Sequence, residues 1–450
     1  MPQLTFKRNA HISYFKRCLT LLPSSAEGHD GNRITIAYFC LSALDLLGAL
    51  DAATTHQEKS QWIRWVWALQ AKYGGFKGST FMTASTPELS SCVYDSGHLP
   101  STYTALLILG ILRAPLDEWI EKLDIDGLDY FLDACADVNG SFSPIPLRSP
   151  HTGPTASLEP CLAPPFQSDA RMAYCASVVD DMIRRARNAS HLESQTRSAS
   201  NHAKESSNQN CTDLSTKDAS IPVNLERRSS RRTRAWLSNC QTWEGGFGQH
   251  PGLEAQGGTT YCAIASLRIL PSETKWNDNF DVPIASRYLV SRQLGGLSET
   301  ADQASGIGGF QGRPGKDEDV CYSFWCGGAL RVLLGEPPLD TEANTRALLD
   351  SQSPIGGFGK ARGEFPDPYH SYLALAALAM NENDSDWSPN TNRGHRAAQL
   401  SNLGATAQVT PEVQSTPIPK LGLKPLDPLW NVSTETRAYI ERCLEDIKRR

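Results

Sequence analysis

The segment 308–325 holds the densest group of side chains that could do chemistry. Arg313 and Lys316 place two cations beside a glycine turn, and Asp319, Cys321 and Tyr322 follow within a few residues. The segment thus combines two positive charges, a carboxylate, a thiol and a phenol. This mixture makes it the first candidate for a functional site.

A histidine further along the chain could complete a metal site. His370 lies in the sequence Asp367-Pro-Tyr369-His370, at the expected start of a helix. Together with Asp319 and Cys321 it forms a mixed oxygen, sulfur and nitrogen set that suits zinc and leaves a fourth position for an exogenous ligand. Spacing by itself does not decide the matter, because such a pattern arises often by chance. The alternative is a buried cysteine at a helix start and a surface histidine.

The cationic residues also have an ordinary interpretation. Arg313 and Lys316 could simply be exposed residues of a turn. Arg171, in Asp169-Ala-Arg171, could serve only as the ion-pair partner of Asp169.

The elements that must position these residues are helices. Apolar residues recur at three- and four-residue steps over Ile34–Leu50, over Tyr103–Leu112 and over Tyr372–Leu378. Such spacing is typical of helices, and alternating strand-like runs are nearly absent. We therefore expect an all-α protein.

A repeated turn organises these helices. The pattern Q-x3-G-G-F occurs at Gln70–Phe76, Gln241–Phe247 and Gln352–Phe358, a looser copy ends at Phe310, and a degenerate copy spans Asn139–Phe142. Paired glycines allow positive φ and close backbone approach, and the phenylalanine can fill the turn. Repeated helical hairpins bury their apolar faces only by stacking on their neighbours. The repeat therefore predicts either an open solenoid or a closed ring.

Composition limits the class of protein. The chain has 450 residues, of which 49 are acidic and 43 basic, a formal net charge of −6, and 40% hydrophobic residues. By length it could form about two to four domains or one large one, with a substantial core. Binding to nucleic acid through a strongly basic surface is disfavoured.

Membrane insertion and secretion are not expected. No uninterrupted apolar run reaches about 18 residues, and the best candidate, Ile36–Leu50, carries Asp45. The N-terminal residues lack an apolar signal core. The 12 cysteines form no C-x-x-C pair, which favours cytosolic thiols over a disulfide framework. We expect a cytoplasmic protein.

Two polar segments interrupt the pattern. Residues 187–232 and 383–428 contain few apolar residues, so we expect a disordered insertion and a polar linker. The repeat domain would then span 1–382, and a C-terminal helix, capped by Ser433, would lie within 429–450. A basic cluster at the end of the insertion is expected to be a solvated flank; it comprises Arg227, Arg228, Arg231, Arg232 and Arg234.

Taken together, the motifs resemble those of the β subunits of protein prenyltransferases. The resemblance covers about residues 10–382 in order and spacing, apart from the insertion. It rests on Gly308–Trp325, Glu254–Cys262, Asp169–Ala176, Ser96–Thr104 and Asp367–His370.

The resemblance implies a fold and a set of ligands. In that family the repeats close into an α-α toroid around an apolar funnel, and a helical α subunit wraps the toroid. Asp319, Cys321 and His370 would hold one zinc ion. The isoprenoid diphosphate would face Arg313, Lys316, Tyr322, Gln256, Gly257 and Gly258, and Arg171 would line the lipid channel near the acceptor peptide.

Two positions favour the type I geranylgeranyltransferases within the family. Farnesyltransferases place a tryptophan at the funnel floor, where this chain has Thr35, which leaves room for a C20 chain. They also have an aspartate that helps to bind magnesium, where this chain has Lys360, which could neutralise the diphosphate directly. The resemblance therefore implies geranylgeranyl diphosphate as donor, no requirement for magnesium, and acceptors with a C-terminal Cys-a-a-X tail, such as small GTPases.

Other features of the chain depart from that pattern. The family usually has histidine at the position of Gln256, which carries no charge. In the acceptor pocket, His98 fits the type I pattern, whereas Tyr369 is more like a farnesyltransferase. The stretch Gln293–Gly306 is longer than usual.

Three alternatives remain at this point. The first is a protein farnesyltransferase β subunit. The second is a terpene cyclase on a similar toroid, although Asp317-Glu-Asp319 is a poor match to the acidic motif of those enzymes. The third is a toroid that acts only as a scaffold.

Overall fold

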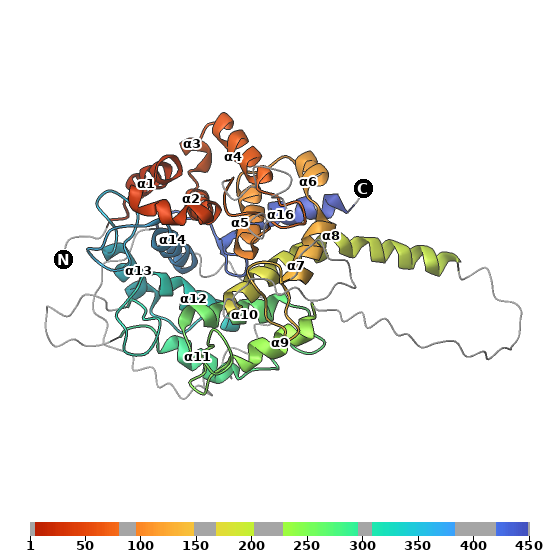
Figure 1. Ribbon diagram of the computed structural model, residues 1–450. Helices are drawn as coiled ribbons and strands as arrows, with labels where there is room; N and C mark the ends of the chain where they lie inside the picture. Colours follow the sequence, from red (N-terminus) through yellow and green to blue (C-terminus); the bar gives the residue numbers. More distant parts are fainter. Residues whose placement is uncertain are drawn as a thin grey trace, which may run out of the picture.

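The computed structural model describes residues 5–80, 96–147, 168–201, 228–295, 308–382 and 420–448. Within these ranges the regular secondary structure is almost all helical (Figure 1), which confirms the predicted all-α class. The inner helices are α2 (Arg33–Leu46), α5 (Leu99–Ile111), α8 (Ala170–Asn201), α10 (Gly257–Ile269), α12 (Cys321–Leu334) and α14 (Pro368–Glu382). The outer helices are α1 (Arg8–Thr20), α4 (His56–Ala68), α7 (Ile125–Cys135), α9 (Ser230–Asn239), α11 (Val282–Val290) and α13 (Thr341–Asp350). Shorter or terminal elements are η1 (Ser24–Asn32), α3 (Leu50–Ala53), α6 (Leu116–Lys122), β1 (Leu426–Asp427), β2 (Val432–Ser433) and α16 (Thr434–Ile447).

The inner helices form a closed ring. Each packs against the next in the order α2, α5, α8, α10, α12 and α14, and α14 packs against α2 again. In α5, every residue except Pro100 is buried. A helix surrounded by protein must be apolar or small on all sides, which the sequence Leu99–Ile111 satisfies. The repeat is therefore a closed α-α toroid and not an open solenoid.

Glycine turns join the outer helices α4, α7, α9, α11 and α13 to the inner helix that follows each of them, whereas α1 leads to α2 through η1. In the turn after α9, Gln241 pairs with Phe247 through a β-bridge, and the Phe247 ring is fully buried. The Phe247 main-chain N–H donates to Thr260 Oγ1 on α10 at 2.8 Å. The other turns have the same bridge, at Gln70 and Phe76, Ala136 and Phe142, Gln293 and Phe310, and Gln352 and Phe358.

The turn glutamines also attach each repeat to the next. The Gln241 side chain donates to the Asp281 carbonyl and accepts from the Asp281 N–H, both at 2.9 Å. Asp281 is the residue that caps α11. Gln293 makes the equivalent pair of bonds with Asp340, which caps α13. One amide side chain therefore fixes the start of the next outer helix.

The last turn closes the ring on the first helix. Gln352 Oε1 accepts from the N–H of Lys7, the residue before α1, at 2.9 Å. It also lies 3.0 Å from Nε2 of the buried His11, whose Nδ1 accepts from the Gly357 N–H at 3.0 Å. The His11 ring stacks on Phe358, with 4.7 Å between the ring centroids. Helix α1 thus takes the place beside the last turn that α11 and α13 take beside earlier turns.

Aromatic side chains from the inner helices meet at the centre of the toroid. The rings of Tyr38, Tyr103 and Tyr174 follow one another with centroids 6.0 and 5.5 Å apart. Their hydroxyl groups donate to main-chain carbonyls of residues 428–431, so this C-terminal segment lies against the inner helices of the ring. The donor–acceptor pairs are Tyr261 with Pro428 (2.7 Å), Tyr174 with Leu429 (2.9 Å), Tyr103 with Trp430 (2.9 Å), and Tyr38 and Tyr372 with Asn431 (2.5 Å each).

The end of the expected linker 383–428 belongs to the packed structure. Residues 383–419 lie outside the described part of the chain, but Leu421, Leu423 and Leu426 are buried against the toroid. These few apolar residues are buried where inner helices end: the Leu423 N–H donates to Glu382 at the end of α14 at 2.8 Å, and the Lys424 N–H donates to the Leu46 carbonyl at the end of α2 at 2.9 Å. Ser433 caps α16 as the sequence predicts, by accepting from the Thr436 N–H at 3.1 Å.

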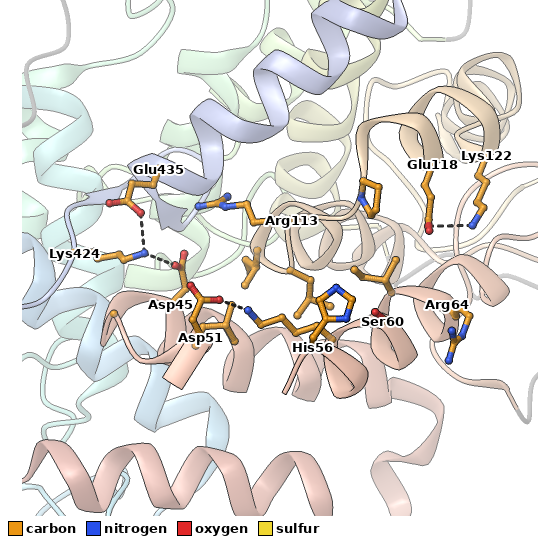
Figure 2. Close-up of a pocket in the computed structure, with 17 residues that line it drawn as sticks. Asp45, Asp51, His56, Ser60, Arg64, Arg113, Glu118, Lys122, Lys424 and Glu435 are labelled. Carbon is orange, nitrogen blue, oxygen red and sulfur yellow. Dashed lines mark hydrogen bonds and ion pairs between the residues drawn. The ribbon is translucent and has the colours of Figure 1, made fainter. Parts of the chain in front are cut away.

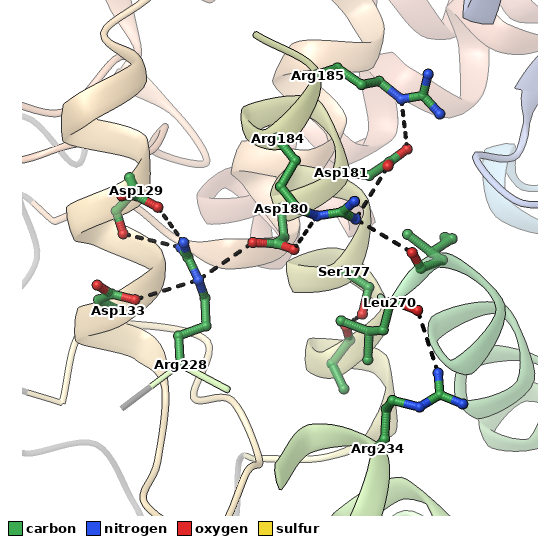
Figure 3. Close-up of polar contacts among 12 residues, drawn as sticks. Asp129, Asp133, Ser177, Asp180, Asp181, Arg184, Arg185, Arg228, Arg234 and Leu270 are labelled. Carbon is green, nitrogen blue, oxygen red and sulfur yellow. Dashed lines mark hydrogen bonds and ion pairs between the residues drawn. The ribbon is translucent and has the colours of Figure 1, made fainter. Parts of the chain in front are cut away.

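The expected insertion 187–232 is helical at both ends. Helix α8 continues to Asn201, and α9 begins at Ser230, whereas residues 202–227 lie outside the described ranges. Figure 3 shows that Arg228 faces carboxylates of α7 and α8; it forms ion pairs with Asp129, Asp133 and Asp180. Arg187 also binds Asp129, at 2.5 Å. Both sides of the insertion are thus held on the same carboxylate.

The expectation that the basic cluster is solvated is wrong for Arg234. Its side chain is only 4% exposed, and its guanidinium donates to the carbonyl groups of Leu267, Leu270 and Trp276. These carbonyls belong to the end of α10 and the loop that follows, where helical carbonyls lack partners within the helix. The arginine therefore caps a neighbouring helix.

Among the described residues, none of the helices is long and apolar enough to cross a membrane.

His11 predicts a pH dependence of stability. Burial lowers the pKa of His11 to about 4, from an ordinary 6.5. Between these values the unfolded chain binds a proton that the folded chain excludes, so the free energy of unfolding must fall as the pH falls. From pH 7 to pH 5 this one group should remove about 2 kcal/mol, because each pKa unit corresponds to about 1.4 kcal/mol.

Urea unfolding at both pH values tests this expectation. In His11→Gln the stability should fall about 2 kcal/mol less between pH 7 and pH 5 than in the unmodified chain. The variant His29→Gln, which replaces an exposed histidine, is the control. Equal losses in the His11 variant and the unmodified chain would refute the assignment.

Candidate functional site

The three predicted metal ligands meet at the start of two adjacent inner helices. Cys321 is the first residue of α12, Asp319 lies in the loop before it, and His370 lies in the first turn of α14. One ligand atom from each residue lies within 4.8 Å of those of the other two. His370 Nε2 is 3.5 Å from Asp319 Oδ1. The site is largely enclosed, since Cys321 is 4% exposed and the side chains of Asp319 and His370 are 13% and 16% exposed.

Main-chain hydrogen bonds fix the loop that carries Asp319. Its N–H donates to the Phe310 carbonyl at 3.0 Å, and the Val320 N–H donates to the Lys360 carbonyl at 2.9 Å. The carboxylate in turn accepts from the Cys321 N–H at 2.9 Å. The glycine turn before α12 and the loop before α14 thus hold the metal ligands in one place.

Asp367 orients His370 and was not among the predicted site residues. Its Oδ2 lies 2.6 Å from His370 Nδ1, and its Oδ1 accepts from the His370 N–H at 2.9 Å. The second bond is typical of a residue that caps a helix, three positions before the donor. Because Nδ1 is occupied, Nε2 is the nitrogen that faces Asp319 and Cys321. An aspartate three residues before a candidate ligand at a helix start was a usable signal in the sequence.

The electrostatics of the cluster favour a bound cation. Burial and the nearby Asp319 raise the pKa of Cys321 well above its usual value, so the isolated thiol holds its proton. Burial alone would raise the pKa of Asp319, but hydrogen bonds with His370 and Cys321 lower it. Burial alone would lower the pKa of His370, but bonds to Asp319 and Asp367 raise it to about 9. A carboxylate, a thiol and an imidazole that compete for protons in an enclosed space fit a zinc site.

Tyr322 is wedged between two glycines of the predicted diphosphate motifs. The Gly257 N–H donates to the Gly312 carbonyl at 3.0 Å, which joins the start of α10 to the turn before α12. A Cβ atom on Gly257 would lie 2.9 Å from Tyr322 Cδ1, and one on Gly312 would overlap the phenol ring. Both glycines are therefore needed for the ring to lie where it does.

The predicted cations lie on the exposed side of this junction. Arg313 forms an ion pair with Glu254, and the two side chains are 39% and 58% exposed. Lys316 and Lys360 are exposed, and Gln256 is half-buried as the residue before α10. Glu254 is a second residue that sequence reasoning did not single out. Its carboxylate orients the Arg313 guanidinium, which would otherwise be free to rotate into solvent.

The remaining predicted residues lie at the starts of other inner helices. Arg171 on α8 binds Asp169 with Nη2 at 2.5 Å, as the ordinary interpretation of this arginine expected. Thr35 on α2 donates to Asn32 at 2.6 Å. His98 precedes α5, and burial lowers its pKa to about 4. Because the inner helices all start at the end of the toroid where the glycine turns lie, these residues share that end with the metal ligands.

A separate cavity lies where α2 and α5 end. Its volume is about 650 Å³, and Figure 2 shows charged side chains around it. Lys424 reaches Asp45 at 2.9 Å and Glu435 at 2.8 Å, and Lys122 reaches Glu118 at 3.0 Å. The lining contains none of the predicted site residues. Its charges largely pair with one another, so the cavity does not belong to the candidate site.

The wedged Tyr322 leads to a prediction about Gly312. In Gly312→Ala the added methyl group must displace the phenol ring. If Tyr322 faces an isoprenoid diphosphate, as the sequence predicts, binding of that diphosphate should weaken by about 10- to 100-fold, as expected for the loss of a hydrogen bond to a charged group. Gly327→Ala on α12 is the matched control, because its Cβ would only approach Met380 Cε at 3.9 Å. Titration calorimetry with the diphosphate measures both. Unchanged affinity in Gly312→Ala would show that the phenol plays no part in binding.

Comparison with known proteins places the chain in a family. The model of the prenyltransferase alpha-alpha toroid domain matches residues 6–432. The β subunit of geranylgeranyl transferase type-1 from Arabidopsis thaliana is 29% identical over 399 residues, which covers 85% of this chain and 86% of that protein. The equivalent subunit from Dictyostelium discoideum is 28% identical and covers 82% and 88%. The protein farnesyltransferase β subunit of Schizosaccharomyces pombe is 26% identical and covers 83% and 78%.

A solved structure supports the fold. Candida albicans protein geranylgeranyltransferase-I complexed with GGPP matches 98% of this chain and 99% of that chain, with a TM-score of 0.70 and 22% sequence identity. Because the family model spans most of the chain and the closed ring of helices agrees with it, this protein belongs to the prenyltransferase α-α toroid family.

Proposed function

We propose that the chain is the catalytic β subunit of a zinc-dependent protein geranylgeranyltransferase of type I. It would transfer a C20 isoprenoid from geranylgeranyl diphosphate to the cysteine thiol of a C-terminal Cys-a-a-X tail, in complex with a helical α subunit. The observation that carries the proposal is the convergence of Asp319, Cys321 and His370 within 4.8 Å. The relatives named as type-1 β subunits support it.

The residues of the site divide the chemistry between them. Asp319, Cys321 and His370 would hold zinc. A free cysteine thiol has a pKa of about 8.5 and is mostly protonated at neutral pH. Bound zinc would stabilise the acceptor cysteine as a thiolate. Attack of a thiolate on C1 of the allylic diphosphate forms the thioether and expels diphosphate. Negative charge builds on the leaving group, so donors fixed beside it lower the barrier. Those donors would be Arg313, Lys316 and Tyr322.

The preference for a C20 lipid rests on two positions. Thr35 is a small residue one helical turn before Tyr38, whose ring belongs to the aromatic centre of the toroid. Lys360 is exposed beside the loop that carries Asp319, where its ammonium could balance diphosphate charge without magnesium. Both features favour the geranylgeranyl enzyme over the farnesyl enzyme.

The alternatives explain the site less well. A terpene cyclase has no use for a buried thiol at the start of α12 that faces a carboxylate and an imidazole. A scaffold has no need for Asp367 to orient His370 toward those groups. A farnesyltransferase shares the metal ligands and is separated only by its lipid and magnesium preferences.

The lipid preference is tested with the chain co-expressed with an α subunit. We expect transfer of the C20 lipid to a Cys-a-a-Leu peptide to exceed transfer of the C15 lipid when both diphosphates compete. The rate should persist without magnesium. Faster use of the C15 lipid together with a magnesium requirement would identify a farnesyltransferase, and a lipid product without peptide attachment would identify a cyclase.

The metal ligands are tested by substitution. Cys321→Ser should lose zinc and transfer activity while the fold survives, because a serine hydroxyl stays protonated at neutral pH and binds zinc poorly. Cys326→Ser, which changes a buried cysteine on the same helix outside the ligand cluster, should keep about one zinc per chain. Metal analysis and circular dichroism measure both properties. Retention of zinc by Cys321→Ser would contradict the ligand assignment.

A further inference from the structure

Three loops at the end of the toroid that carries the metal ligands repeat one structure. They follow the buried phenylalanines of three glycine turns and span 248–256, 311–319 and 359–367. Each contains a tight turn with one glycine at positive φ, which is Gly252, Gly315 or Gly363. A main-chain N–H closes each turn by donating to a carbonyl, from Leu253 to His250 (3.1 Å), from Lys316 to Arg313 (3.3 Å) and from Glu364 to Ala361 (3.2 Å). The loops can therefore be compared position by position.

Neighbouring loops are joined by the same main-chain bond. At the junction of the first and second loops, the Gly257 N–H donates to the Gly312 carbonyl at 3.0 Å. At the junction of the second and third loops, the Val320 N–H donates to the Lys360 carbonyl at 2.9 Å. The two donors occupy equivalent positions in the repeat, and so do the two acceptors. The main chain thus holds both junctions in the same way.

The first of these two junctions differs from the second by an ion pair. The Glu254 carboxylate binds Nη1 of Arg313. At the second junction the equivalent positions hold Asp317 and Ala361, which cannot form such a pair. Because the second junction forms without an ion pair, the fold does not require one at the first. A pair between exposed side chains also adds little to stability, so a role outside folding explains it better.

Arg313 keeps donors that an anion could use. Glu254 occupies only Nη1, and within the described residues Nε and Nη2 have no hydrogen-bond partner. A guanidinium presents five N–H donors in a rigid fork that matches the oxygens of a phosphate group. A long, exposed side chain must be ordered when it binds a ligand, which lowers the affinity. An arginine that a carboxylate already holds in place has less freedom left to lose.

We propose that Glu254 is a positioning residue for the donor diphosphate, whose carboxylate holds Arg313 so that the remaining nitrogens meet the diphosphate oxygens. The inference rests on the proposed function, in which Arg313 faces the diphosphate. It predicts an effect opposite in sign to that of charge alone. A carboxylate repels a nearby polyanion, so its removal by itself would tighten diphosphate binding. If the carboxylate acts chiefly by holding Arg313, its removal weakens binding.

The test measures the binding of geranylgeranyl diphosphate to the complex with the α subunit, by titration calorimetry. Glu254→Gln should weaken binding by about 2- to 10-fold, as expected when one flexible side chain must be ordered by the ligand. Asp317→Asn is the matched control, because it removes the same charge from the equivalent position of the next loop. The control should bind the diphosphate equally or more tightly. Thermal unfolding, followed by circular dichroism, should be unchanged in both variants.

A second substitution shows whether Glu254 acts through the arginine. In an Arg313→Gln background, Glu254→Gln should cause no further loss of affinity, because the side chain that it positions is gone. Equal or tighter binding by Glu254→Gln alone, or the same loss in the Arg313→Gln background, would overturn the role of Glu254 and leave the proposed function standing. If the unmodified complex binds neither the C20 nor the C15 diphosphate, both are overturned.

Discussion

The closed packing of the inner helices is the constraint on which the rest of the structure depends. Among the inner helices, α5, α8, α10, α12 and α14 each follow a glycine turn, whereas α2 follows η1, and the turns lie at one end of the ring. Residues at the start of any inner helix therefore gather at that end, however far apart they are in the sequence. Cys321 and His370 come together because α12 and α14 are neighbours in the ring. If α14 did not also pack against α2, the ring would open and the starts of these two helices would no longer be neighbours.

The C-terminal segment connects several inner helices by hydrogen bonds. The main-chain carbonyls of residues 428–431 would be buried acceptors without partners if the tyrosine hydroxyls did not reach them, and such groups are costly to leave unpaired. The tyrosines are in turn buried phenols that need acceptors. Tyr38, Tyr103 and Tyr261 satisfy this need on three different helices. The segment and the ring therefore depend on each other, although the chain joins them only through the stretch 383–419.

The sequence predicts features within a single turn or helix start well, and contacts between residues far apart in the chain poorly. The Q-x3-G-G-F turns could be found because glycine, glutamine and phenylalanine each have a local reason to occur there. The metal ligands could be proposed because Cys321 and His370 each stand at a helix start. The hydrogen bond of Tyr369 with Trp325 and those of Arg234 with the end of α10 could not be predicted, because each joins two different helices. The burial of Leu421 and Leu423 was missed for a similar reason, since the helix ends that cover this short segment belong to distant parts of the chain.

The charges of the ligand side chains balance both with and without a bound metal. The pKa shifts leave Asp319 negative, His370 positive and Cys321 neutral, so these three side chains together carry no net charge. If a divalent cation replaces the two protons on the sulfur and the imidazole, the carboxylate and thiolate again balance the charge. An enclosed site tolerates both states because neither buries an unpaired charge, which would be costly. A cluster of this kind can therefore fold before it binds a metal, and its affinity should depend on how tightly the protons are held.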